Sequence, residues 1–317
     1  MKAFELDGVL SYNESMKLKG LSYLFAIAFL LVISAPSLAY AHQPRVINSE
    51  NTQVVDPEVS KAYYATLTGS PHIYTIDSKE AFDLYVGILV PDIVSTKKDI
   101  LTEVFKEGVK IATLGGASSI WKPYFETFGQ SHYFDGGEYK ARAEAGVYII
   151  KVSNPDNTGK YSLAVGEIEA FDGKEGANAI SMIPDLKRDF FEESPISFIF
   201  SPFGWGLIVV MYLLASIFGL IYRAIFINFK IILLKIKLRR HNLETTKIEH
   251  APEQQKKNIG KTDRLLRLAI GLGLLLWAIT TTWSPILIFF SGFAIFEAVF
   301  SWCAFYAAIE KNTCTTE

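Results

Sequence analysis

Cysteine is almost absent from this chain of 317 residues, which contains only Cys303 and Cys314. A domain upstream of residue 303 therefore has no disulfide and depends on its hydrophobic core for stability. The spacing of the two cysteines matches neither a zinc-binding pattern nor a CxxC redox motif. They remain candidates for binding a soft ligand or for thiol chemistry, and a purely structural role is the simpler alternative.

Signatures of the common enzyme classes are missing as well. The chain contains no GxSxG, HExxH or P-loop motif, and His42, His72 and His132 are scattered without the spacing of metal ligands. We therefore expect no enzymatic activity, no cofactor and no resident metal. Two turns rich in oxygen atoms, 135–138 and 154–157, keep calcium open as an alternative, although ordinary turns use the same residue types.

Residues 1–41 have the features of a secretory signal peptide. Lys17 and Lys19 precede an apolar run over 21–33, and Ala39 and Ala41 are the small residues that signal peptidase requires. We expect cleavage before His42, with an uncleaved anchor helix as the alternative. Acidic residues upstream of Met16 are unusual in a signal and favour that methionine as the true start.

Three further apolar segments are long enough to cross a bilayer. The first, 198–222, has no charged residue, and 265–283 and 286–309 form a closely spaced pair. Each approaches or exceeds the roughly 20 residues that span a hydrocarbon core. The sequence thus predicts a multi-pass protein of the cell (inner or cytoplasmic) membrane with three transmembrane helices after signal removal.

The distribution of charge predicts the orientation. From Arg223 to Arg267 the chain carries twelve Lys or Arg and four acids, whereas 42–200 carries fifteen bases and twenty-three acids. Short basic loops stay in the cytoplasm, so we expect 42–197 outside and the C-terminus inside. The acidic balance of the outer part makes nucleic acid an unlikely partner.

The basic segment 223–256 has apolar residues at helical spacing among its lysines and arginines. This pattern is typical of a helix in the headgroup layer, with the lysines reaching water. A straight continuation of the preceding transmembrane helix is the alternative.

Residues 257–314 carry a resemblance to a known family. The segment opens with Lys257-Asn258-Ile259-Gly260 and Asp263-Arg264-Leu265-Leu266-Arg267, and closes with Trp302-Cys303-Ala304-Phe305-Tyr306 and Asn312-Thr313-Cys314. In these residues it resembles the YgaP-like transmembrane domain family. The resemblance implies a pair of membrane helices and says little about activity, because this domain is joined to varied partners. One of these is a cytoplasmic sulfurtransferase domain, which nothing in this chain resembles.

Glu297 is the one ionisable residue in the middle of a predicted span. With no basic residue expected near it, we expect a neutral acid that is hydrogen-bonded within a helix interface, and a proton or solute relay is the alternative. Arg264 and Arg267 are interpreted as anchors at headgroup depth. Small residues at Ser291, Ala294, Ala298 and Ser301 would allow close packing, either within the pair or in a homodimer.

Residues 42–172 predict an exported β domain. Alternating or apolar runs at 62–68, 72–76 and 82–90 indicate strands, 101–105 with 109–114 indicates a hairpin, and 146–152 with 160–165 indicates a closing hairpin. The expected fold is an all-β antiparallel sandwich or jelly roll. An acidic linker, 173–197, should join it to the first span.

The closing strands, a glycine-led strand followed by an Asn/Asp/Gly turn and Gly-Lys-Tyr-Ser-Leu-Ala-Val, resemble exported β-sandwich modules of the bacterial pre-peptidase C-terminal type. The resemblance implies an accessory module that binds or stabilises. An aromatic-rich stretch that includes Trp121 and Tyr124 is a candidate binding face, and the rim of a sandwich core is the alternative.

The sequence as a whole predicts a non-enzymatic, membrane-anchored prokaryotic envelope protein. Its exported β-sandwich would bind or sense a ligand, the helical pair would anchor it, and the lipid bilayer would be its main partner. The alternative is a small membrane transport or thiol-handling module that uses Glu297, Cys303 and Cys314.

Overall fold

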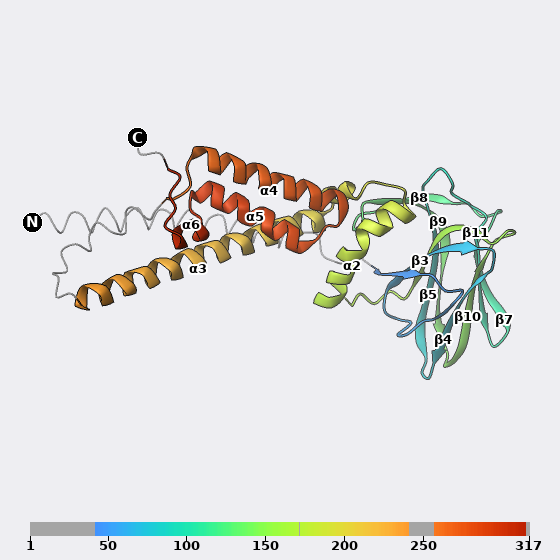
Figure 1. Ribbon diagram of the computed structural model, residues 1–317. Coiled ribbons are helices and arrows are strands. Elements are labelled where there is room, and N and C mark those ends of the chain that lie inside the picture. The colour runs from blue at the N-terminus through green and yellow to red at the C-terminus, as the bar shows by residue number, and fades with distance from the viewer. Residues whose placement is uncertain (1–41, 171, 241–256, 315–317) are drawn as a thin grey trace, which may run out of the picture. The chain divides into compact units, whose positions relative to one another are not determined.

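A computed structural model describes residues 42–170, 172–240 and 257–314 (Figure 1). These residues divide into a β-rich unit that ends at Phe203 and a helical unit that begins at Gly204. The predicted signal peptide, residues 1–41, lies outside the described residues. So do residues 241–256 of the basic segment.

Two sheets make up the β-rich unit. In spatial order, the six-stranded sheet contains β1 (Gln43–Ile47), β3 (Lys61–Thr68), β11 (Thr158–Val165), β5 (Phe82–Pro91), β9 (Ser131–Ala143) and β8 (Lys122–Glu126). The five-stranded sheet contains β2 (Asn51–Gln53), β4 (His72–Ser78), β10 (Gly146–Ser153), β6 (Leu101–Lys106) and β7 (Val109–Gly115).

The core lies between the two sheets. Inward-facing residues such as Leu84 and Val86 from one sheet and Tyr74, Ile76 and Ile150 from the other are buried in a single hydrophobic cluster. They alternate with more exposed residues along each strand, because successive side chains of a strand point to opposite faces. The β-sandwich prediction is therefore confirmed at this level.

Two strand pairs contradict the prediction of an antiparallel fold. β1 pairs with β3 in parallel, and β2 pairs with β4 in parallel. Both β1 and β2 are edge strands, and only residues 48–50 separate them in the sequence. The chain therefore crosses from one sheet to the other before it turns back, and each sheet is mixed.

The predicted closing hairpin is also wrong. β10 lies in the five-stranded sheet between β4 and β6, whereas β11 lies in the six-stranded sheet between β3 and β5. The turn between them connects the two sheets. Asn154 holds it, because its side-chain amide donates to Thr158 O at 2.9 Å and to Asp99 Oδ1 at 3.0 Å, and its Oδ1 accepts from Thr158 N at 3.0 Å.

The segment predicted as an acidic linker folds onto the sandwich. It contains α2 (Gly173–Asp185), the π-helical turn η1 (Leu186–Phe190) and the 3-10 helix η2 (Pro195–Phe200). Asp172 caps α2 by accepting from Glu175 N at 2.8 Å. Leu186, Phe190 and Phe191 are buried against the outer face of the six-stranded sheet, where Tyr64, Leu89 and Tyr133 meet them.

This covering layer should stabilise the isolated β-rich unit. We expect the fragment 42–203 to unfold in urea with a free energy at least about 3 kcal/mol larger than that of 42–175, since the longer one buries three more large apolar side chains. Urea titration followed by far-ultraviolet circular dichroism compares the two. Equal unfolding free energies would show that the layer adds nothing to the fold.

The helical unit contains α3 (Pro202–Arg240), α4 (Lys261–Thr281), α5 (Pro285–Phe300) and the short α6 (Ala304–Ala308). α3 is one continuous helix (Figure 1), which agrees with the alternative of a straight continuation as far as Arg240. Pro202–Phe226 and Lys261–Thr281 are long and apolar enough to cross a membrane.

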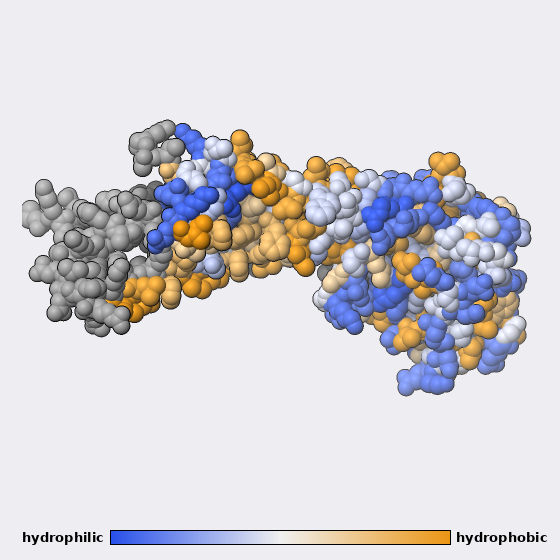
Figure 2. Space-filling model, in the orientation of Figure 1, coloured by the Kyte–Doolittle hydropathy of each residue, from blue (hydrophilic) through white to orange (hydrophobic). Residues whose placement is uncertain are grey.

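α5 is shorter than the predicted span. It has 16 residues, about 24 Å at 1.5 Å per residue, and ends at Ser301, which adopts the left-handed conformation with φ of 56°. Apolar residues cover much of the face of the helical unit that Figure 2 shows. Exposed apolar residues of this unit include Leu265, Leu266, Leu276, Trp277, Ile286, Phe290 and Val299.

Small residues bring α3, α4 and α5 together. Ser291 is fully buried; its hydroxyl donates to Gly271 O at 2.8 Å and lies 2.8 Å from the hydroxyl of Tyr212. A side chain at Gly219 would overlap the ring of Phe296. Within this chain the small residues therefore serve close packing of its own helices, as expected for membrane helices.

Candidate functional site

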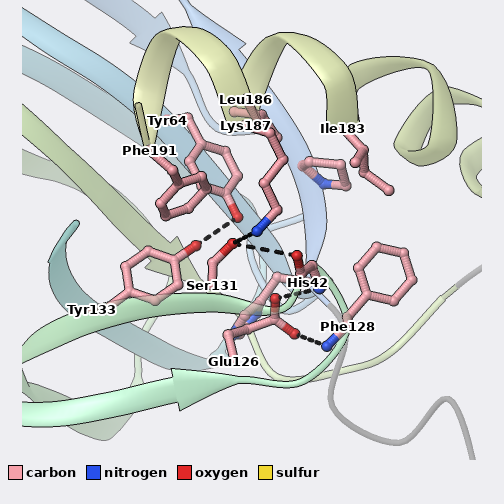
Figure 3. Close-up of a pocket in the computed structure, with 12 residues that line it drawn as sticks. His42, Tyr64, Glu126, Phe128, Ser131, Tyr133, Ile183, Leu186, Lys187 and Phe191 are labelled. Atoms are coloured by element: carbon pink, nitrogen blue, oxygen red, sulfur yellow. Dashed lines mark hydrogen bonds between the residues drawn. The ribbon is translucent and has the colours of Figure 1, made fainter. Parts of the chain in front are cut away.

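The β-rich unit contains a small, partly open cavity, the β8–β9 pocket, of about 50 Å³ (Figure 3). It lies between the turn that joins β8 to β9 and the layer formed by α2 and η1. Its lining comprises His42, Pro44, Tyr64, Glu126, Phe128, Gly129, Ser131, Tyr133, Ile183, Leu186, Lys187 and Phe191.

Lys187 is the central polar residue of the β8–β9 pocket. It lies in the π-helical turn η1 and is only 1% exposed. Its ammonium group donates to Gln130 O at 2.7 Å, to Ser131 Oγ at 3.0 Å and to Glu193 Oε2 at 2.7 Å. All three donors are thus used, as the burial of a charge requires. Lys187 therefore ties η1 to the start of β9.

Other ionisable groups around the pocket have shifted pKa values. Burial raises the pKa of Glu126, an effect that backbone donation from Gly129 and Phe128 partly offsets. Burial also raises the pKa of Tyr64 and Tyr133, whose hydroxyls lie 3.1 Å apart, and lowers that of Lys187. Such groups around one cavity are typical of binding sites, although a structural ion-pair network produces the same shifts.

The turn between β8 and β9 is also attached to the chain that enters α3. The hydroxyl of Ser201 donates to Phe128 O at 2.7 Å. The ring of Phe128 lies 4.4 Å from that of Phe203 and 6.4 Å from that of Phe198, measured between centroids. Lys187 and Ser201 therefore hold the same turn from two points of the segment that precedes α3.

The two aromatic residues proposed as a binding face lie in different environments. Trp121 packs against the sandwich core, and its indole N–H donates to Gly116 O at 3.2 Å. Tyr124 lies on the edge strand β8 with 44% of its surface exposed, and its ring centroid is 6.2 Å from that of Tyr133. Only Tyr124 is placed to meet a ligand in solvent.

The two turns proposed as calcium sites are closed by protein groups. Asp135 Oδ1 accepts from Gly137 N at 2.7 Å, and Asp156 forms an ion pair with Lys97. Within the described residues, no three His, Cys, Asp or Glu side chains lie close enough to hold a metal ion.

The helical unit contains a buried ion pair. Glu297 on α5 binds Arg267 on α4, and both side chains are largely buried. The expectation that Glu297 has no basic partner is therefore wrong. The Arg267 guanidinium also lies 5.1 Å from the ring of Tyr306, and Arg264 Nε donates to Ala298 O at 2.8 Å.

The two cysteines lie near the same asparagine. Cys303 is buried, its N–H donates to Asn258 Oδ1 at 2.7 Å, and Asn258 Nδ2 donates back to Cys303 O at 2.7 Å. Thr313 N donates to Asn258 O at 3.1 Å, which brings the neighbouring Cys314 to the start of α4. Both thiols are free. Asn258, Cys303 and Thr313, which belong to the segments that resemble the family, thus hold the C-terminal segment against the start of α4.

Comparison with known proteins supports the assignment of this unit. Residues 255–317 match the family model described as inner membrane protein YgaP-like, transmembrane domain. This part of the chain resembles a known membrane domain. With its YgaP-like helical pair and its β-rich unit, the protein is membrane-anchored. No curated protein matches the chain.

Two solved structures are similar to part of this chain. One is the pre-peptidase C-terminal domain of a collagenase from Bacillus anthracis, with 11% identity and a TM-score of 0.22, covering 40% of this chain and 96% of that one. The other is a β-glucosidase from Paenibacillus barengoltzii, with 10% identity and a TM-score of 0.21, covering 41% of this chain and 14% of that one.

Proposed function

We propose that this protein is a membrane-anchored envelope receptor without enzymatic activity, in which the exported β-sandwich binds or senses a ligand and the YgaP-like helices hold it in the membrane. The observation that carries the proposal is the double attachment of the β8–β9 turn. Lys187 and Ser201 fix this turn to the segment that leads directly into α3.

This attachment gives a physical route for a sensor. A ligand that shifts the edge strands β8 and β9 would change the bonds at Gln130 and Phe128, which are the acceptors of Lys187 and Ser201. Because both donors precede α3 closely in the sequence, the strain would reach the first membrane helix. A ligand can shift such an equilibrium only by its difference in affinity for the two arrangements.

A second candidate function is a small transport or thiol-handling module. The Arg267–Glu297 pair favours it, since ionised residues within membrane helices often belong to a pathway for ions or solutes. Cys303 and Cys314 would then supply thiols at the end of the same helical pair. These groups also have structural surroundings: Glu297 binds Arg267 between α5 and α4, and Cys303 forms hydrogen bonds with Asn258.

Reporter fusions that determine the orientation test the receptor role, because a receptor for an external ligand needs its β-sandwich outside. A fluorescent reporter that matures only in the cytoplasm should be active when fused after Glu317 and inactive when fused after Ser194. An alkaline phosphatase that is active only after export should give the reverse pattern. The short basic loops that favour the cytoplasm are the physical reason. Cytoplasmic activity of the Ser194 fusion would exclude a receptor for an external ligand.

A further inference from the structure

A groove of about 810 Å³ runs along the edge of the sandwich where β1 and β2 are the outermost strands. Its volume lies in the range of small-molecule binding sites. Besides residues of these two strands, Lys61 and Tyr63 from β3 and the start of α2 line it. None of the candidate residues from the sequence belongs to this groove.

Polar residues occupy positions in the groove that the alternation of the strands assigns to the core. Tyr63, Ala65 and Leu67 of β3 point into the core between the sheets, and Lys61 shares their face. In β1, Gln43 is the register partner of Lys61 and Arg45 that of Tyr63. Departures from a fold's own pattern are expected at functional sites, where they cost stability.

Lys61 is a buried cation without an ion pair. It is only 8% exposed, and its ammonium group donates to two neutral acceptors, Val55 O at 2.7 Å and Asp56 O at 2.9 Å. No carboxylate forms an ion pair with it among the described residues. One of its three N–H donors is therefore unused. Burial lowers the pKa of Lys61, and a bound anion would raise it again.

Tyr63 adds a hydroxyl to the lining of the groove. The residue is 4% exposed, and no described protein group forms a hydrogen bond with its hydroxyl. Thr52 and Gln53 on β2 add further polar side chains to the lining. β1 is an edge strand of its sheet, but Pro44 has no N–H and its carbonyl accepts from Arg45 Nη1 at 2.9 Å, so a ligand meets the side chains of the groove rather than a free strand edge.

Acidic residues also line the groove and limit what it accepts. Glu175 is neutralised by Arg45 at 2.9 Å, whereas Asp56 and Asp172 have exposed surfaces in contact with water. Water screens exposed charges more strongly than buried ones. The least exposed charge of the groove is therefore the positive one of Lys61, on which Asp56 and Glu175 act without a direct ion pair.

We propose that this groove binds a carboxylate group, which would accept hydrogen bonds from the ammonium group of Lys61 and the hydroxyl of Tyr63. The proposal gives the binding role proposed above a ligand class. A small organic acid and the free C-terminus of an extended peptide share this chemistry.

Isothermal titration of the purified full-length protein in lipid nanodiscs tests the proposal. The probes are acetate, N-acetyl-tetraalanine with a free C-terminus and the same peptide with an amidated C-terminus. We expect at least one of the two carboxylates to bind, and the amide to bind at least tenfold more weakly than the free peptide if the peptide binds. Binding of acetate alone would identify small acids as the source. Absence of carboxylate binding, or equal binding of acid and amide, would overturn the proposal.

Two variants assign the binding to the groove. Lys61→Met should weaken it at least tenfold, and Tyr63→Phe, which keeps the buried ring, should weaken it about threefold even if Lys61→Met perturbs the fold. Lys79→Met, at an exposed lysine outside the groove, should leave it unchanged. Normal binding by both groove variants would refute the site. The reporter fusions above are independent of this result, so a failure of the groove would leave the orientation intact.

Discussion

The Lys187→Met variant of the fragment 42–203 is expected to lose about 3 kcal/mol of unfolding free energy. The methylene chain of lysine is replaced by a similar apolar one, but the three acceptors of the ammonium group lose their donor. Removal of one partner from a buried ion pair leaves the other charge uncompensated, which costs about 3–5 kcal/mol. Because Glu193 retains some exposure, we expect the lower end of that range. Urea titration measures the difference.

Lys140→Met is the matched control in the same fragment. Lys140 also forms an ion pair, with Glu167 at 2.7 Å, but both side chains are about half exposed. An exposed pair contributes at most about 1 kcal/mol. A loss of less than about 1 kcal/mol for Lys187→Met would mean that Lys187 does not tie η1 to the sandwich, and the proposed route from the β-sandwich to α3 would lose one of its two attachments.

In the helical unit, Glu297→Gln is expected to destabilise the packing of α4 and α5 by about 3 kcal/mol, because it leaves the Arg267 charge buried without its partner. The sequence predicted the opposite result, since a neutral acid would tolerate an amide in its place. Arg267→Gln should cost a similar amount. The double variant should recover part of the loss, because two amides can share a hydrogen bond without any charge.

Thermal unfolding of the full-length protein in detergent, followed by circular dichroism at the helical band, measures these changes. Lys257→Gln serves as the control, since Lys257 is exposed in the same unit. If the losses of the two single variants sum to the loss of the double variant, the two residues are not coupled. Their ion pair then contributes nothing to the packing. An unchanged melting temperature for Glu297→Gln would restore the interpretation of Glu297 as a neutral acid.

Seven of the eleven described strands could be predicted because their residues are apolar or alternate with a period of two, as in Ala62 to Thr68 of β3. The strands β1, β2, β8 and β9 were missed; in β1, Gln43, Pro44 and Arg45 place polar residues and a proline where a core strand is normally apolar. The same departure from the pattern marks the carboxylate groove. These polar residues could have indicated the groove from the sequence, but only if the inward-facing side of β1 had been known.

Other features depend on pairing that a local pattern does not contain. The polar turn after β10 is compatible with a hairpin and with a crossing between sheets, and only the neighbours of β11 distinguish them. The segment 173–197 was predicted as a linker because it is rich in acidic residues, and its buried apolar residues were not recognised. Arg267 and Glu297 are 30 positions apart, so their ion pair depends on how α4 and α5 pack.

The position of β11 has a consequence for the order in which the protein can fold during synthesis. β11 lies between β3 and β5 in the six-stranded sheet, although it is the last strand of the chain. The sheet therefore remains split into two parts until residue 165 has emerged, and its outer face remains open until Phe191 follows. Folding that waits for distant segments is slow. The sandwich can therefore be completed only after the whole of 42–191 has been made, and a chain that stops earlier leaves one face of the sheet uncovered.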